Sequence, residues 1–160
     1  MSYSVELAKQ IENYLNSQEW HFDFDQEIGH FKFGMNINSK VKNVNIRILV
    51  ADDFFTVYAT APMRADENDF VTMHSLGEYF SRANFGLRTG NFEIDFNDGE
   101  MRYKASLYVP DQLPTLKMVE RVVDIPFGMW GRYGNGMLNV LYSGGEPAKE
   151  IEIAEKPMEG

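Results

Sequence analysis

Hydrophobic residues near the start of the chain recur with the period of an α-helix. One side of a helix drawn over this segment carries Leu7, Ala8, Ile11, Tyr14 and Leu15. The other side is polar, and Ser4 stands where a side chain can cap the first turn. The pattern predicts an amphipathic helix with one buried face.

The chain then changes to an alternation of hydrophobic and polar residues, which is the pattern of a strand with one buried face. Four stretches of this kind precede Pro62, at 20–25, 31–37, 44–50 and 55–59. Turn-forming residues at 38–40 and 51–53 separate the later stretches. Short connections and polar opposite faces are typical of an antiparallel meander.

The helical period returns after Pro62 and predicts a second helix that begins at Asp66. Its apolar face would hold Phe70, Met73, Leu76, Gly77 and Phe80. Two more strands are expected near 92–96 and 101–109. Between them, Asp98-Gly99 predicts a type I′ hairpin turn, because both residues tolerate a positive φ.

A third helix is expected from Pro114, because proline suits the first helical position. Its apolar face would hold Leu116, Val119, Val122, Val123 and Phe127. Pro126 has no N–H to donate and is expected to kink or end this helix. Any helix that resumes after it should stop at Ser143-Gly144-Gly145.

The pattern as a whole predicts an α+β fold with an antiparallel sheet of about five to six strands and helices packed on one face. The expected order is a helix, three to four strands, a helix, two strands and a last helix. A chain of 160 residues is long enough for one domain with its own core, which is expected over 1–145. The charged segment 146–160 holds two prolines and is expected to be an acidic tail without fixed structure.

Charge and composition exclude several classes of function. Lys and Arg number 15 and Asp and Glu number 24, so the net charge is −9. Nucleic acid and anionic lipid both require a cationic surface, so neither is expected as a partner. The absence of cysteine excludes thiol catalysis, disulfides and cysteine-ligated metals. No leader-like segment and no membrane-length apolar run is present, so we expect a cytoplasmic protein.

No motif in the chain assembles catalytic machinery. His74 and Glu78 are four residues apart on a predicted helix, but two ligands do not make a zinc site. A glycine-rich segment comprises Gly128, Gly131, Gly134 and Gly136. It lacks the dinucleotide-binding fingerprint, no P-loop is present, and its glycines indicate close helix packing or a broken helix. We therefore expect no enzyme activity, no metal and no cofactor.

Candidate contact residues gather in the same segment. They are Met129, Trp130, Arg132, Tyr133 and Met137. Trp, Tyr and Arg dominate the binding energy of protein interfaces, and Met suits an adaptable apolar surface. These residues are predicted to form a partner or ligand surface. The alternative is that Trp130 and Tyr133 belong to the core.

Asn84 projects onto the apolar face of the second helix. A buried amide must find hydrogen-bond partners. We expect Asn84 to bond to backbone groups where the helix passes into Phe85-Gly86.

Four stretches in the second half of the chain carry a family resemblance. They are Asn84-Phe85, Gly90-Asn91-Phe92-Glu93-Ile94-Asp95, Asp98-Gly99-Glu100-Met101-Arg102-Tyr103 and Arg132-Tyr133. On these stretches the chain from about 62 to 145 resembles the YbjN-like family, described as bacterial sensory transduction regulators. The resemblance implies a fold similar to type III secretion chaperones, which are small, acidic, dimeric and non-enzymatic. The chain departs from the family pattern at Pro126 and the glycines that follow.

Two functions follow from the residues and the resemblance together. The first is a non-enzymatic protein-binding module, chaperone-like or regulatory, that forms a homodimer and binds a protein partner. The alternative is a sensory domain that binds a small molecule.

Overall fold

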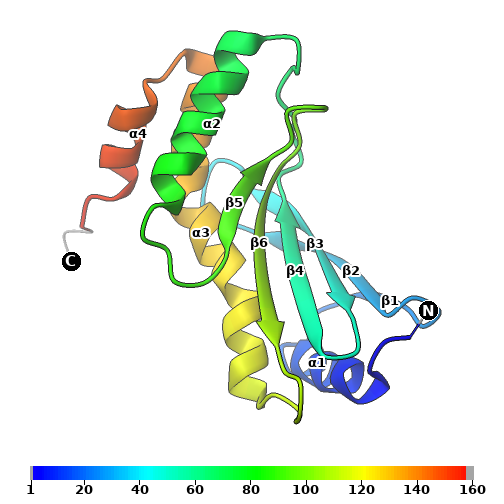
Figure 1. Ribbon diagram of the computed structural model, residues 1–160. Coiled ribbons are helices and arrows are strands. Elements are labelled where there is room, and N and C mark those ends of the chain that lie inside the picture. The colour runs from blue at the N-terminus through cyan, green and yellow to red at the C-terminus, as the bar shows by residue number, and fades with distance from the viewer. Residues whose placement is uncertain (1, 158–160) are drawn as a thin grey trace.

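The computed structural model describes residues 2–157, which form an α+β fold (Figure 1). The helices are α1 (Val5–Ser17), α2 (Phe70–Asn84), α3 (Leu116–Ser143) and α4 (Pro147–Ala154). The strands are β1 (Asp23–Asp25), β2 (His30–Asn36), β3 (Asn43–Val50), β4 (Phe54–Thr60), β5 (Asn91–Ile94) and β6 (Met101–Tyr108). Over these residues the strands make one antiparallel sheet in the order β1-β2-β3-β4-β6-β5. The predicted fold class and the order of elements are confirmed, with α4 in addition.

The helices cover one face of the sheet and leave the other face open. One buried row across four strands consists of Ile46, Ala59, Tyr103 and Phe92. In Figure 1, α2, α3 and α4 stand together on one side of the sheet. α1 packs beside α3, where the hydroxyl of Tyr14 donates to the carboxylate of Asp124 over 2.7 Å. Because side chains alternate along a strand, the polar residues of the same strands lie on the open face.

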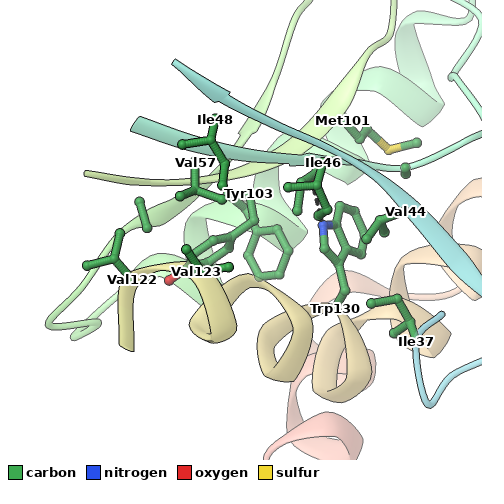
Figure 2. Close-up of a cluster of buried hydrophobic side chains, with 14 of the residues drawn as sticks. Ile37, Val44, Ile46, Ile48, Val57, Met101, Tyr103, Val122, Val123 and Trp130 are labelled. Atoms are coloured by element: carbon green, nitrogen blue, oxygen red, sulfur yellow. Dashed lines mark hydrogen bonds between the residues drawn. The ribbon is translucent and has the colours of Figure 1, made fainter. Parts of the chain in front are cut away.

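Trp130 of α3 lies at the centre of the core and is fully buried. Its indole N–H donates to the carbonyl of Ala59 in β4 over 2.9 Å. Figure 2 shows the ring pointing from α3 toward the sheet, beside Ile46 and Val44. The ring of Phe92 in β5 meets it edge-on, with 5.1 Å between centroids. Apolar burial and one directional hydrogen bond therefore fix α3 against the middle of the sheet.

Two predicted helix boundaries are confirmed. Ser4 caps α1, because its hydroxyl oxygen accepts from the N–H of Leu7 at 3.1 Å. Gly144 ends α3 in the left-handed conformation, with φ of 65°. The N–H of Gly145 then donates to the carbonyl of Asn139 at 2.9 Å. Both ends use the capping chemistry that the sequence indicates.

The prediction that α2 begins at Asp66 is wrong, since the helix begins at Phe70. Asp69 caps it by accepting from a backbone N–H at 3.1 Å. The carboxylate of Asp66 accepts instead from the N–H of Asn68 at 2.9 Å, a local turn that competes with helix. Phe70, expected on the apolar face, is 71% exposed. It is the first residue of the helix, and the buried residues begin about one turn later, at Met73.

The predicted type I′ turn between β5 and β6 is also wrong. Gly99 has a φ of 77°, but Asp98 does not have a positive φ. The connection is longer, because the N–H of Asp95 donates to the carbonyl of Glu100 at 2.9 Å. Asp98 accepts from the N–H of Glu100 at 2.9 Å, which favours this wider turn. A side chain at Gly99 would collide with the backbone of Ala65, so the position requires glycine.

Pro126 does not end α3, contrary to one of the two expectations for it. The helix runs for 28 residues, from Leu116 to Ser143, with Pro126 inside. An interior proline removes one hydrogen bond and costs about 3 kcal/mol. Pro126 is buried together with Val122 and Val123, which face the sheet in Figure 2. Packing on this buried stretch offsets the lost hydrogen bond.

The segment expected to be a loose acidic tail is helical over Pro147–Ala154. Pro147 occupies the first turn, where a missing N–H is harmless. Ile151 is buried, and α4 contacts both α2 and α3. The spacing of Ile151 and Ala154 gives this short helix an inward face. Residues 158–160 of the expected tail lie outside the described residues.

Asn84 finds its partners across the chain instead of at Phe85-Gly86. Its side-chain amide donates to the carbonyl of Phe92 at 2.9 Å and accepts from the N–H of Phe92 at 2.7 Å. Phe92 lies in β5, the edge strand of the sheet. The N–H and carbonyl of Phe92 are thus already hydrogen-bonded to Asn84, so they are not available for pairing β5 with another strand.

We expect Asn84→Ala to lower the free energy of unfolding by about 2 kcal/mol, because two hydrogen bonds to a buried residue are lost. Urea unfolding followed by circular dichroism measures the change. Ser81→Ala on the exposed side of α2 is the matched control and should stay within about 0.5 kcal/mol of the wild type. Equal effects of the two substitutions would contradict this role of Asn84.

Candidate functional site

A groove of about 720 Å³ opens on the side of α3 that faces away from Trp130. Three parts of the chain form it: α3, α4 with the residues after it, and the loop between β2 and β3. Its lining consists of Asn38, Phe127, Gly128, Gly131, Arg132, Asn135, Gly136, Asn139, Glu150, Ile153, Ala154, Lys156 and Pro157. The groove is therefore a surface feature of the helix layer, separate from the sheet.

Two of the four glycines in α3 are needed for close packing inside the protein. A Cβ on Gly134 would lie 2.8 Å from the hydroxyl of Ser39, and one on Gly136 would overlap the hydroxyl of Tyr79. Tyr79 is fully buried and donates to the carbonyl of Tyr133 at 2.6 Å. These glycines let α3 approach α2 and the loop between β2 and β3.

Gly128 and Gly131 line the groove, and within residues 2–157 they have no such packing role. A Cβ on Gly128 would have no atom of the described residues within 4 Å, and one on Gly131 would meet the carbonyl of Asn38 at 3.8 Å. Alanine would fit at both positions and would favour the helix by about 1 kcal/mol each. The glycine-rich segment is thus one unbroken helix with two packed and two open glycines.

The second wall of the groove is held in place by side chains of α3. The hydroxyl of Tyr133 donates to the carboxylate of Glu155 at 2.9 Å. The amide of Asn139 donates to the carboxylate of Glu150 at 3.1 Å. The guanidinium of Arg132 donates to the carbonyl of Ala154 at 3.3 Å. The shape of the groove therefore depends on these attachments of α4 and the residue after it.

The groove carries two cations in an acidic protein. Arg132 and Lys156 both line it, and neither forms an ion pair with a carboxylate of residues 2–157. Glu150 also lines the groove but is engaged by Asn139. Glu150 keeps its negative charge, so the lining holds two positive charges and one negative charge, and the positive charge lies at Arg132 and Lys156.

The structure separates the five residues predicted as a contact surface. Trp130, Tyr133 and Met137 are buried, so they belong to the core and are not exposed for a partner. Met129 is partly buried and packs against the core. Arg132 is exposed and lines the groove. The positions of Trp130 and Tyr133 agree with the alternative interpretation, in which both residues belong to the core.

Sequence reasoning missed the α4 side of the groove. Ile153 is 56% exposed there, and its neighbour Ala154 lines the same wall. The available signal was Pro147 at a helix start, followed by apolar residues at helical spacing. Asn135 and Asn139 were also missed, because isolated amides on a helix carry no motif.

Buried tyrosines join the elements around the groove. Burial, together with the hydrogen bond to Glu155, raises the pKa of Tyr133 to about 12. Burial likewise raises the pKa of Tyr103 to about 12 and raises that of Tyr79. At neutral pH all three keep their proton and act as hydrogen-bond donors. Tyr79 and Tyr133 thereby join α3 to α2 and to the residue after α4, whereas Tyr103 joins β6 to the loop before β5.

The residues considered for metal binding lie apart from the groove. His74 packs edge-on against Phe96, with 5.8 Å between ring centroids, and Glu78 pairs with Arg82 at 2.8 Å. Within residues 2–157, no group of three or more His, Asp or Glu side chains could hold a metal ion. None of the helices in that range is long and apolar enough to cross a bilayer.

The fold and the groove define an α+β domain with an open groove on its helix layer. Comparison of the chain with protein-family models, with curated proteins and with solved structures gave no significant match.

The two kinds of glycine should respond differently to the same substitution. We expect Gly136→Ala to destabilise the fold by about 2 kcal/mol, because Tyr79 must move. Gly128→Ala should stabilise it by about 0.5–1 kcal/mol through helix propensity. Urea unfolding of both variants measures the difference, and a shared sign would show that the packing assignment is wrong.

The raised pKa of Tyr133 predicts a loss of stability at alkaline pH. The unfolded chain releases this proton near pH 10, whereas the folded protein holds it until about pH 12. Below about pH 10 the contribution is complete, and it is lost as pH rises through the folded pKa. Tyr133→Phe should therefore reduce the slope of unfolding free energy against pH above pH 10. The exposed Tyr142→Phe is the control and should leave that slope unchanged.

Proposed function

We propose that this protein is a non-enzymatic protein-binding module, chaperone-like or regulatory, which holds a segment of a partner protein in the groove between α3 and α4. The proposal includes a homodimer and a cytoplasmic location, as expected from the sequence. The partner segment would carry apolar side chains and at least one carboxylate.

The open glycines are the observation that carries this proposal. Gly128 and Gly131 weaken α3 by about 1 kcal/mol each relative to alanine. Gly134 and Gly136 compensate this loss by close packing within the protein, whereas Gly128 and Gly131 do not. A partner whose backbone lies against α3 would make use of the space above them. Such a role accounts for a loss of helix stability that packing among residues 2–157 does not explain.

The lining of the groove supports the stated chemistry of the partner. Phe127 and Ile153 offer apolar surface at opposite walls. Arg132 and Lys156 offer positive charge that no carboxylate of the described residues neutralises by an ion pair. A segment with apolar residues and a carboxylate would satisfy both.

The resemblance to the YbjN-like family supports the proposal from a different part of the chain. Apart from Arg132-Tyr133 of α3, its residues build the hairpin of β5 and β6, and Asn84 binds the edge of that hairpin. They are structural positions, so they bear on the fold and carry no site across. The similarity to type III secretion chaperones remains part of the proposal.

A second candidate function is a sensory domain that binds a small molecule. The groove volume of about 720 Å³ supports it, because small-molecule sites commonly span about 300–1,000 Å³. The open glycines favour the protein partner, since small ligands are usually held by larger side chains in a more enclosed site.

The test places a benzophenone amino acid at Ile153, in the groove wall, and in a control protein at the exposed Ser81 of α2. After irradiation in cells, we expect a partner protein to be attached at position 153 and not at position 81. Gly128→Leu, which fills open space, should abolish the attachment. Ser81→Leu adds the same side chain elsewhere and should leave it intact.

Other outcomes of this experiment contradict the proposal. Attachment of a second copy alone would make the groove a dimer contact. No attachment, combined with a metabolite that raises the melting temperature of the wild type but not of Gly128→Leu, would establish the sensory alternative.

A further inference from the structure

The open face of the sheet has a charge distribution unlike the rest of the chain. Of 24 Asp and Glu residues, none lies in β2, β3, β4 or β6, the four central strands. Those strands contain Lys32, Arg47, Arg102 and Lys104. All four alternate with inward-facing residues and so lie on the open face. A protein with net charge −9 therefore has a cationic centre on its sheet.

Strand register places these cations side by side. Lys32 is directly opposite Arg47, Arg47 is opposite Tyr58, and Tyr58 is opposite Lys104. The guanidinium of Arg102 lies 4.1 Å from the centre of the Tyr58 ring. Like charges directly opposite each other on a sheet are destabilising. The Lys32–Arg47 pair therefore reduces the stability of the isolated sheet.

The carboxylates near these cations belong to the two edge strands and to Glu100, which precedes β6 and pairs with Arg64 and Arg102. Glu93 of β5 binds Arg102 at 2.9 Å and Lys104 at 3.4 Å. Asp23 and Asp25 of β1 stand opposite Lys32 and His30. Within residues 2–157, however, neither Lys32 nor Arg47 forms an ion pair.

The pKa of His30 is affected by the same cations. Its pKa is lowered first by burial and then by the charges of Arg47 and Lys32, against an opposing effect of Asp25. Arg47 is therefore the strongest of the charges that act on His30.

Two shallow hollows meet at Tyr58 on this face. One, of about 320 Å³, is bordered by Arg47, Arg64 and Arg102, and also by Glu100, which pairs with the last two. The other, of about 270 Å³, is bordered by His30, Leu49 and Phe54. Phe54 is 43% exposed and stands opposite Tyr108, which is 66% exposed. The face therefore combines a cationic half with an apolar, aromatic half.

We propose that the open face of the sheet binds a short acidic segment of another protein, with its carboxylates at Lys32 and Arg47 and an apolar side chain beside Leu49 and Phe54. Charge complementarity supports this occupant, and it also relieves the repulsion between Lys32 and Arg47. A long polyanion is disfavoured, because it would cross the edge carboxylates and approach a chain of net charge −9. The inference does not depend on the groove, which lies on the helix layer at the opposite side of the sheet.

The test uses a short fluorescein-labelled peptide of Asp and Glu with two Phe residues, and fluorescence anisotropy at low salt. We expect saturable binding that weakens as salt increases. The same peptide with Asn and Gln in place of its acids should not bind. The double variant Lys32→Gln, Arg47→Gln should bind the acidic peptide about fivefold more weakly or worse.

The matched control is Lys117→Gln, Arg121→Gln, which removes the same charge from exposed positions of α3. It should bind like the wild type, and melting temperatures no lower than that of the wild type should show that both variants are folded. Equal binding by the two double variants would overturn the proposal, as would no saturable binding up to about 1 mM peptide.

Two further outcomes would identify a different occupant. Tighter binding of an oligo-dT strand than of the peptide, lost in the Lys32 and Arg47 variant, would assign the face to single-stranded nucleic acid. A homodimer that dissociates only in that variant would assign it to a second copy of this chain.

Discussion

The hydrogen bond from the Trp130 indole to the carbonyl of Ala59 fixes the position of α3 on the sheet. It joins the middle of a long helix to a central strand, and the ring fills the space between α3, Phe80 and Phe92. Because α3 is pinned on this side, its other side is presented to solvent in a fixed orientation. The groove with Gly128, Gly131 and Arg132 is formed by that second side. Burial of one tryptophan thus determines where the candidate site can be.

The sequence allows the fold to be predicted wherever one local pattern agrees with the packing. Alternating residues identify β3 because Ile46 and Ile48 face the helices, and Ser4 identifies the start of α1 by capping chemistry alone. The prediction fails where contacts distant in sequence decide the outcome. Pro126 remains inside a helix because the residues around it are buried, and Asn84 bonds to a strand that follows it in the chain. Neither contact is visible from spacing.

The candidate site could be predicted only in part, because it too depends on contacts between residues that are distant in the sequence. The glycines of α3 stand out in the sequence, and Arg132, one of the predicted contact residues, lines the groove with Gly128 and Gly131. Which glycines are packed depends on Tyr79 and Ser39, from two other elements. The second wall required α4, whose charged composition resembles that of a loose tail. Trp130 and Tyr133 have the composition of an interface but are buried, because residue type alone does not distinguish a binding surface from a core.

Locally unfavourable residues in this protein fall into two groups. For Pro126, Gly134, Gly136 and Asn84, which weaken a helix or bury a polar group, the structure shows the compensation: close packing or a pair of hydrogen bonds. For Gly128, Gly131, Lys32 and Arg47, residues 2–157 show no such packing or ion pair. All four lie at a groove or on an open face, on opposite sides of the sheet. If the missing compensation comes from a bound molecule, the first pair requires close approach of a backbone and the second pair requires negative charge, so the two surfaces select different parts of a partner.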